Sequence, residues 1–79
     1  MSNNIERFDV GDNVAWGSGA VGKVIAVVRE DDWAFKCVPT GYRRPVQGYG
    51  RPLRRISYLV AGTESDIAWW PRPGSLRRL

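Results

Sequence analysis

Short stretches in which hydrophobic residues alternate with polar ones, or run together, recur along this chain of 79 residues. Val10, Val14 and Trp16 fall at even spacing, and a run rich in valine and isoleucine follows at residues 20–28. A period of two and β-branched side chains are typical of strands. We therefore predict a short first strand that ends near Trp16 and a longer second strand over residues 20–28.

Trp33, Phe35 and Cys37 hold alternate positions of the next stretch, residues 33–38, and Pro39 follows it. Since successive side chains of a strand point to opposite faces, this alternation predicts a third strand with the three side chains on its core-facing side. A nucleophilic cysteine needs an activating base nearby. We therefore interpret Cys37 as a core residue and not as a nucleophile.

The last two predicted strands cover residues 53–61 and 66–70, with a turn between them. In the second of these strands, alternation with Ile67 predicts that Trp69 points into the core and that Trp70 lies at the surface. Tryptophan is enriched among the residues that dominate protein interfaces. Trp70 is therefore a candidate for partner binding.

No long helical period occurs along the chain, and only Ser75 is placed to cap one short helical turn over residues 76–79. Five short strands separated by turn residues predict an all-β fold. A small all-β chain removes its sheet edges by closing into a barrel. We predict a flexible N-terminus over residues 1–6 and a single five-stranded barrel domain over residues 7–79.

The glycines at positions 17, 19 and 22 fit the G-x-G-x-x-G pattern of nucleotide-binding loops, and Lys23 follows them. Such a loop leads from a strand into a helix, and a phosphate loop needs Ser or Thr after its lysine. Here the loop leads into strand residues, and the residue after the lysine is Val24. We therefore predict that Gly17 and Gly19 form a turn and that Gly22 marks a bulge or a bend.

The same region contains Gly11-Asp12-Asn13-Val14, then the glycine turn, then Gly22-Lys23-Val24. A phrase G-D-x-V, a strand, a glycine turn and G-x-V in the second strand resembles the opening of small SH3-like barrels of the KOW and Tudor type. This resemblance implies an SH3-like barrel. It implies the fold and not a particular function.

The closing part of the chain runs Y-L-V at residues 58–60, I-A-W-W-P at residues 67–71 and L-R-R at residues 76–78. This order is similar to the Y-x-V, V-Q-I-Y-P and L-x-R order of plasmid-borne type II dihydrofolate reductases, which are SH3-like barrels of similar length. Ala68 stands where that family has its pore glutamine, and Trp70 where it has tyrosine. The resemblance therefore implies a shared topology without the reductase activity.

Composition narrows the class of protein. Hydrophobic residues make up 43% of the chain, which is ordinary for a globular domain. A single cysteine excludes an internal disulfide, and the lack of histidine argues against a structural zinc site. The start of the chain does not fit a secretion signal, and no apolar run is long enough to span a membrane. We expect a cytoplasmic domain without a metal or a cofactor.

The formal net charge of +4 is unevenly distributed. Residues 1–32 contain six acidic and three basic residues, whereas residues 33–79 contain two acidic and nine basic residues. Ten of the 12 basic residues are arginine, whose planar guanidinium group favours forked contacts to phosphate or carboxylate. We therefore expect the second part of the chain to meet an anionic partner.

The candidate binding site is a long basic loop, predicted over residues 40–52 between the third and fourth strands, with the start of the strand that follows. It combines arginine, which neutralises phosphate, with tyrosine, which stacks on unpaired bases. Long loops in compact domains are often functional. The predicted partner-binding residues are Lys36, Tyr42, Arg43, Arg44, Tyr49, Arg51, Arg54, Arg55 and Trp70.

No enzyme class has support in the sequence. General acid–base catalysis most often uses histidine, and the adjacent carboxylates of Asp31 and Asp32 fit a charged turn. We predict a non-enzymatic binding module for nucleic acid or a nucleoprotein. The alternatives are a protein-interaction module or inhibitor, for example one from a mobile element, that docks on an acidic protein, and a homo-oligomer similar to the type II reductases.

Overall fold

A computed structural model describes residues 7–43 and 51–79 of the chain. The strands are β1 (Asn13–Trp16), β2 (Ala20–Val28), β3 (Ser57–Gly62) and β4 (Arg77–Arg78), and the two short 3₁₀ helices are η1 (Ala34–Cys37) and η2 (Pro73–Ser75). The described residues contain no α-helix, and none of their helical segments is long and apolar enough to cross a membrane. The prediction of an all-β fold is confirmed.

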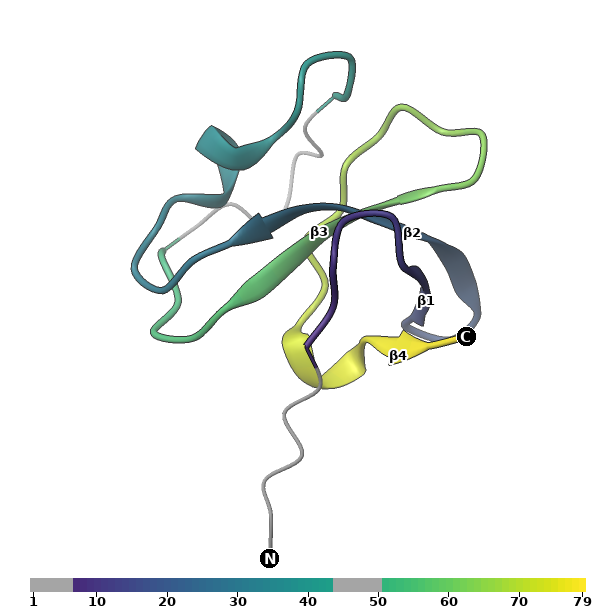
Figure 1. Ribbon diagram of the computed structural model, residues 1–79, viewed down its shortest axis with the longest axis horizontal. Helices are drawn as coiled ribbons and strands as arrows, with labels where there is room; N and C mark the ends of the chain where they lie inside the picture. Colours follow the sequence, from purple (N-terminus) through teal and green to yellow (C-terminus); the bar gives the residue numbers. More distant parts are fainter. Residues whose placement is uncertain (1–6, 44–50) are drawn as a thin grey trace, which may run out of the picture.

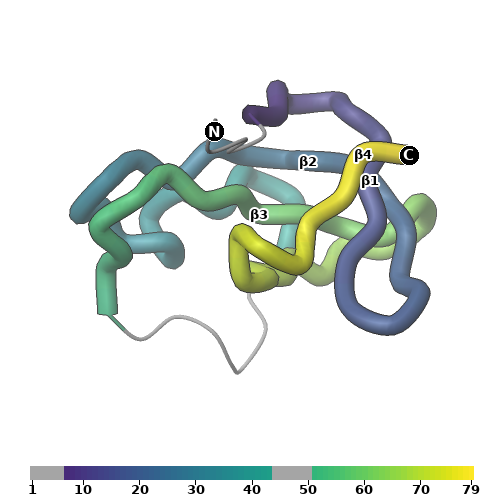
Figure 2. Tube along the Cα trace, turned by 90° about the horizontal axis from the view of Figure 1, so that it is seen from below, coloured from purple at the N-terminus to yellow at the C-terminus, as the bar shows by residue number. Residues whose placement is uncertain are grey.

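The four strands form one antiparallel sheet in the order β3-β2-β1-β4 (Figure 1). β2 is the longest strand and pairs with β1 on one side and with β3 on the other. The first strand of the chain pairs with the last, so β1 and β4 lie side by side (Figure 2). This pairing brings the C-terminus of the chain next to the segment that precedes β1.

The glycines near the start of the chain serve two different purposes. Gly17 and Gly19 have φ angles of 61° and 142° in the turn between β1 and β2, which confirms the predicted glycine turn. A Cβ atom on Gly22 would lie 1.9 Å from the carbonyl oxygen of Ala61 in β3. The irregularity in the β2–β3 pairing lies further along β2, after Val24. Gly22 therefore allows a close backbone approach and does not mark the predicted bulge.

Side chains pack on both faces of the sheet. The first core cluster contains Phe8, Val14, Val24, Tyr58, Val60 and Leu76, and the second contains Ile25, Val28, Ala34, Leu59, Ala61 and Ala68. β3 contributes to both clusters because its side chains alternate between the two faces of the sheet. β3 is therefore buried on both faces, although it is one of the two edge strands of the four-stranded sheet.

The prediction of a third strand over residues 33–38 is wrong, because residues 34–37 form η1. Ala34 is buried in the second core cluster, whereas Trp33 and Phe35 are 40% and 37% exposed. Side chains of a 3₁₀ helix repeat every three residues, so an alternation of period two does not place them on one face. The small side chain of Ala34 packs inward, and its two aromatic neighbours are left outside.

Residues 67–70 lie along the outer edge of β3 without forming a regular strand. Val60 and Trp69 exchange two backbone hydrogen bonds, of 2.9 and 2.8 Å. The predicted orientation of this segment is wrong: Ala68 is fully buried and 45% of Trp69 is exposed. Trp70 is half-buried, and its indole Nε1 donates to the buried hydroxyl of Ser57 at 2.9 Å. A shift of one residue inverts a strand, and here the small Ala68 takes the inward position.

The predicted helical turn over residues 76–79 is also wrong. Leu76 is buried in the first core cluster, and the next two residues form β4. A 3₁₀ turn forms just before it, where the backbone N–H and the hydroxyl of Ser75 both donate to the Arg72 carbonyl at 2.9 Å. Pairing with the edge of β1 satisfies backbone groups that a single frayed turn would leave to solvent.

Candidate functional site

Three arginines at the end of the predicted loop are exposed on a fixed piece of backbone. Arg51, Arg54 and Arg55 are exposed, and their side chains make no hydrogen bond or ion pair with another described residue. Between them, the carbonyl of Leu53 accepts a hydrogen bond from the Asp31 amide at 2.7 Å. The backbone that carries these guanidinium groups is therefore ordered before a partner arrives.

Arg43 lies at the other end of the loop and is held to the segment beside β3. Its carbonyl accepts a hydrogen bond from the Ala68 amide at 2.7 Å, and its Nε lies 3.1 Å from Oδ2 of Asp66. The two side chains are 78% and 53% exposed, so the ion pair contributes about 0–1 kcal/mol to stability. An anionic partner can therefore replace Asp66 as the partner of Arg43.

Two predicted stacking residues belong largely to the core. Tyr42 and Trp70 are half-buried and pack against the second core cluster. Much of each ring is therefore already in contact with the protein; Trp70 is partly exposed, as the sequence predicted, but it also packs against the core. Arg44 and Tyr49, also predicted to bind the partner, lie outside the described residues.

An exposed aromatic pair occurs at η1, where the sequence pattern predicted core residues. The ring centroids of Trp33 and Phe35 lie 5.8 Å apart with an interplanar angle of 58°. Lys36, a predicted site residue, is exposed, and its Nζ lies 5.9 Å from the Phe35 ring centroid. The pattern of period two gave no signal for this surface, because it assigned both rings to a core-facing side.

An acidic turn lies beside the loop arginines. Asp31 has a φ of 62°, which confirms the predicted charged turn. Its hydrogen bond to Leu53 places the turn against residues 51–55, and Figures 1 and 2 show the two segments at the same end of the molecule. Glu30, Asp31 and Asp32 therefore border the arginines on one side and oppose the approach of an anion from there. The sequence alone does not reveal this neighbourhood.

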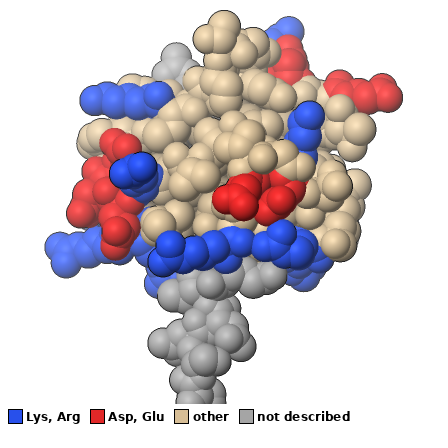
Figure 3. Space-filling model, viewed as in Figure 1, with Lys and Arg blue, Asp and Glu red and all other residues tan. Residues whose placement is uncertain are grey.

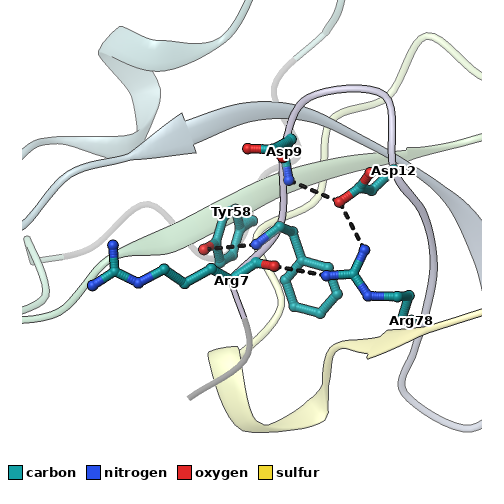
Figure 4. A network of polar contacts seen from close by, with 6 residues as sticks. Arg7, Asp9, Asp12, Tyr58 and Arg78 are labelled. Carbon is teal, nitrogen blue, oxygen red and sulfur yellow. Dashed lines mark hydrogen bonds and ion pairs between the residues drawn. The ribbon is translucent and has the colours of Figure 1, made fainter. Parts of the chain in front are cut away.

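A polar network joins the two ends of the described chain, and no sequence pattern indicated it. The Arg78 guanidinium donates to the Asp12 carboxylate at 3.0 Å and to the Arg7 carbonyl at 2.7 Å (Figure 4). Its Cζ lies 4.9 Å from the Phe8 ring centroid. Phe8 packs edge-on against Tyr58 at 5.3 Å, and its amide donates to the Tyr58 hydroxyl at 3.1 Å. β4 is thereby tied to the segment that precedes β1.

Asp12 is the acceptor at the centre of this network. Its Oδ2 accepts hydrogen bonds from the Asp9 amide at 2.9 Å and from Arg78 at 3.0 Å. The backbone hydrogen bond, followed by the hydrogen bond and positive charge of Arg78, holds the pKa of Asp12 below its ordinary value of 3.8. Asp12 is therefore ionised at neutral pH and stays paired with Arg78.

Cys37 has the chemistry of a protonated thiol. Its Sγ donates to the Trp33 carbonyl at 3.6 Å, and burial, with the charge of Asp32, raises the pKa of the thiol. A thiol whose pKa is raised is a weak nucleophile at neutral pH. Within residues 7–43 and 51–79, no three Cys, Asp or Glu side chains come together to hold a metal ion.

Basic side chains gather along one edge of the molecule. Figure 3 shows a row of Lys and Arg atoms at the lower edge, where Figure 1 places η2, β4 and the start of the described chain.

No protein-family model, curated protein or solved structure matches this chain. Function is therefore inferred from the residues and their geometry.

Proposed function

We propose that this protein is a non-enzymatic binding module for an anionic partner and that the partner is nucleic acid. One observation carries the proposal: Arg51, Arg54 and Arg55 are exposed and make no ion pair within the described part of the chain. A carboxylate in contact with an arginine neutralises much of its charge. The positive charge of these three guanidinium groups is therefore available to a partner.

An SH3-like barrel is the fold that we propose for the domain. Trp69 pairs with Val60 of β3, Ile67 pairs with Arg43, and β2, β1 and β4 follow β3 in the sheet. Five extended segments in this order close into a barrel when the first and last of them meet, and these two are joined through η2. In agreement with the KOW and Tudor resemblance, the G-D-x-V motif leads into β1 and the G-x-V motif lies in β2.

We propose nucleic acid in preference to an acidic protein because several arginines and a tyrosine follow one another along the loop. Guanidinium groups bind phosphate through paired hydrogen bonds, and a nucleic acid presents phosphates at regular intervals. Arg44 and Tyr49 would add charge and a stacking ring, and Arg43 would exchange Asp66 for a phosphate. Lys36 would extend the contact from η1. A cytoplasmic location stays a prediction of this proposal, whereas a homo-oligomer belongs to the reductase-like alternative.

The test is a titration of labelled oligonucleotides, single-stranded and duplex, with the full chain at several salt concentrations. We expect affinity to fall steeply with salt, and the slope to drop by about 0.7 per lost phosphate contact on single strands and about 0.9 on duplex. The variant with Arg51→Ala, Arg54→Ala and Arg55→Ala should lose most of this binding. Its stability should change by less than about 0.5 kcal/mol for each exposed position.

Lys23→Ala is the matched control, because it removes one exposed charge from β2 without touching the loop. It should keep the affinity and the salt slope of the unmodified chain. Failure to bind either oligonucleotide, with nuclease-resistant capture of one acidic protein through the three arginines, would show that the partner is a protein. A saturable thermal shift with NADPH, which we do not expect, would favour the reductase-like alternative.

A further inference from the structure

Arg7 continues the charge of the loop arginines along the edge of the molecule. Phe8, the next residue, belongs to the first core cluster, against which Ile56 packs directly after Arg54 and Arg55. Figure 4 shows the Arg7 side chain extended along β3, toward the end of that strand at which the loop arginines lie. Arg7 is exposed and makes no side-chain hydrogen bond or ion pair with another described residue.

η2 and β4 extend the same edge beyond Arg7. Arg72 is exposed at the start of η2, and its carbonyl accepts the Ser75 hydroxyl at 2.9 Å. Arg77 donates to the Ser75 carbonyl at 3.2 Å, and Arg78 donates to the Arg7 carbonyl at 2.7 Å. The Arg78 hydrogen bond holds that side chain beside Arg7, whereas Arg77 also donates to the Gly17 carbonyl, in the turn between β1 and β2, at 3.2 Å.

We call this surface the basic edge; Figure 4 shows two of its residues, Arg7 and Arg78, next to each other, and Figure 3 shows Lys and Arg atoms in a row along the lower edge of the molecule. Of the described acidic groups near it, Asp12 is paired with Arg78, the Glu30–Asp32 turn borders the loop arginines on their other side, and Asp9 is exposed two residues from Arg7. The positive potential therefore runs from the loop toward the two ends of the chain. The basic edge consists of Arg7, Arg54, Arg55, Arg72, Arg77 and Arg78.

We propose that the basic edge follows the phosphate backbone of a nucleic acid duplex; this rests on the proposed function and names the class of nucleic acid. Phe8 and Tyr58 are buried, and Trp16 is half-buried against the same core cluster, so none of these three rings is fully exposed beside the edge. Binding of single strands depends on bases that stack on exposed rings. The exposed pair of Trp33 and Phe35 belongs to the η1 segment, which Figure 1 shows on the other side of β2 and β3 from η2 and β4.

A duplex is bound through its phosphates without access to the bases. A row of exposed arginines, several of which are carried by backbone that is held by hydrogen bonds, can meet a regular row of phosphates. Arg77 and Arg78 also hold β4 in place, so they are poor positions for a test. Arg7 and Arg72 carry charge on exposed side chains whose backbone groups make the structural contacts.

The experiment compares the full chain with Arg7→Gln, Arg72→Gln and Lys23→Gln, each of which removes one positive charge. Lys23 pairs with Ala61 of the second core cluster, whereas Arg78 pairs with Val14 of the first, so the control lies on the opposite face of the sheet. The probes are a fluorescent DNA duplex of about two helical turns and one of its strands alone. Affinity is measured at several salt concentrations.

We expect the duplex to bind more tightly than the single strand. Arg7→Gln and Arg72→Gln should each lower the salt slope on duplex by about 0.9, while Lys23→Gln leaves it unchanged. Duplex binding that depends on Arg54 and Arg55 but not on Arg7 or Arg72 would contradict the proposal that the basic edge follows a duplex. It would leave the proposed function, binding of nucleic acid, in place. Tighter binding of the single strand would contradict the proposal that the bound nucleic acid is a duplex, and would also leave the proposed function in place. Binding of neither probe would overturn both proposals.

Discussion

The two faces of β3 are covered in different ways. The first core cluster is closed by the two ends of the chain, which contribute Phe8 and Leu76, and Arg78 binds across them. The second cluster is closed by η1 and by the segment beside β3, which contribute Ala34 and Ala68. One face is therefore covered by large buried side chains and a polar network, and the other by two small buried side chains with the half-buried Tyr42 and Trp70 packed around them.

This difference explains where the aromatic residues lie. On the first face Phe8 and Tyr58 are inside, and charged groups bind over them. On the second face an alanine takes each inward position, so the large residues next to it in the sequence, Trp33, Phe35 and Trp69, are left exposed. Alternation of large and small residues therefore predicts the core-facing side of a strand correctly only where the large residues are the buried ones.

The largest effect is expected where β2 and β3 approach each other, because both faces depend on that contact. Gly22→Ala would place a Cβ atom 1.9 Å from the Ala61 carbonyl oxygen, so the strands must separate. We expect a loss of at least about 3 kcal/mol in the free energy of unfolding, measured by urea denaturation.

Gly62, which pairs with Gly22 across the two strands, provides the control. A Cβ atom there would meet nothing closer than the Ser65 Cβ at 3.6 Å. Gly62→Ala should therefore unfold close to the unmodified chain. Equal stability of the two variants would show that the close approach at Gly22 is not a constraint.

The second face is tested by its two adjacent tryptophans. Trp70→Ala removes a half-buried indole and leaves the Ser57 hydroxyl without its donor, so it should cost about 3 kcal/mol. Trp69→Ala removes a ring that is 45% exposed and should cost about 1 kcal/mol or less. Thermal melts of the two variants side by side measure the difference. If Trp69→Ala melted at a lower temperature than Trp70→Ala, Trp69 would be the inward residue, as alternation with Ile67 predicts.

Two arginines are expected to contribute differently to stability. Arg78 belongs to the polar network on the first face of β3, and Arg43 to the ion pair with Asp66 beside the second face. Arg78→Ala removes a carboxylate contact, a carbonyl contact and a ring contact together, and should cost about 1–2 kcal/mol. Arg43→Ala removes the same charge from an exposed pair with Asp66 and should cost less than about 0.5 kcal/mol. Chemical denaturation gives both values. Equal losses would mean that the network adds nothing to a simple surface pair.

The smallest effect is a dependence of stability on pH. The pKa of Asp12 is lower in the folded chain than its ordinary value of 3.8, so the ionised carboxylate stabilises the fold above that pH. This contribution is lost as the pH falls through the folded-state pKa. Thermal melts from neutral pH to about pH 2 should show a fall in stability, and part of that fall should be absent in Asp12→Asn. An identical acid profile for the variant would contradict the assignment.

The regular strands and the tight turns were predictable from the sequence. β1, β2 and β3 all lie in or near the predicted stretches, because β-branched residues and a period of two mark them locally. The turn with Gly17 and Gly19 and the turn at Asp31 follow from the residues that accept a positive φ. The arginines of the loop were also predictable as exposed charges, and Arg51, Arg54 and Arg55 are exposed.

Contacts between distant segments decided the rest. Which of Ala68 and Trp69 faces inward depends on the space left beside Leu59 and Ala61, and that space exists only after β3 is in place. The basic edge depends on Arg7 and Arg78, which are 71 residues apart in the chain and lie together because β4 pairs with β1. Local sequence therefore determined the strands and turns, since backbone preference acts over a few residues. Tertiary packing determined side-chain orientation and charge neighbourhood, since both depend on which distant residues share a surface.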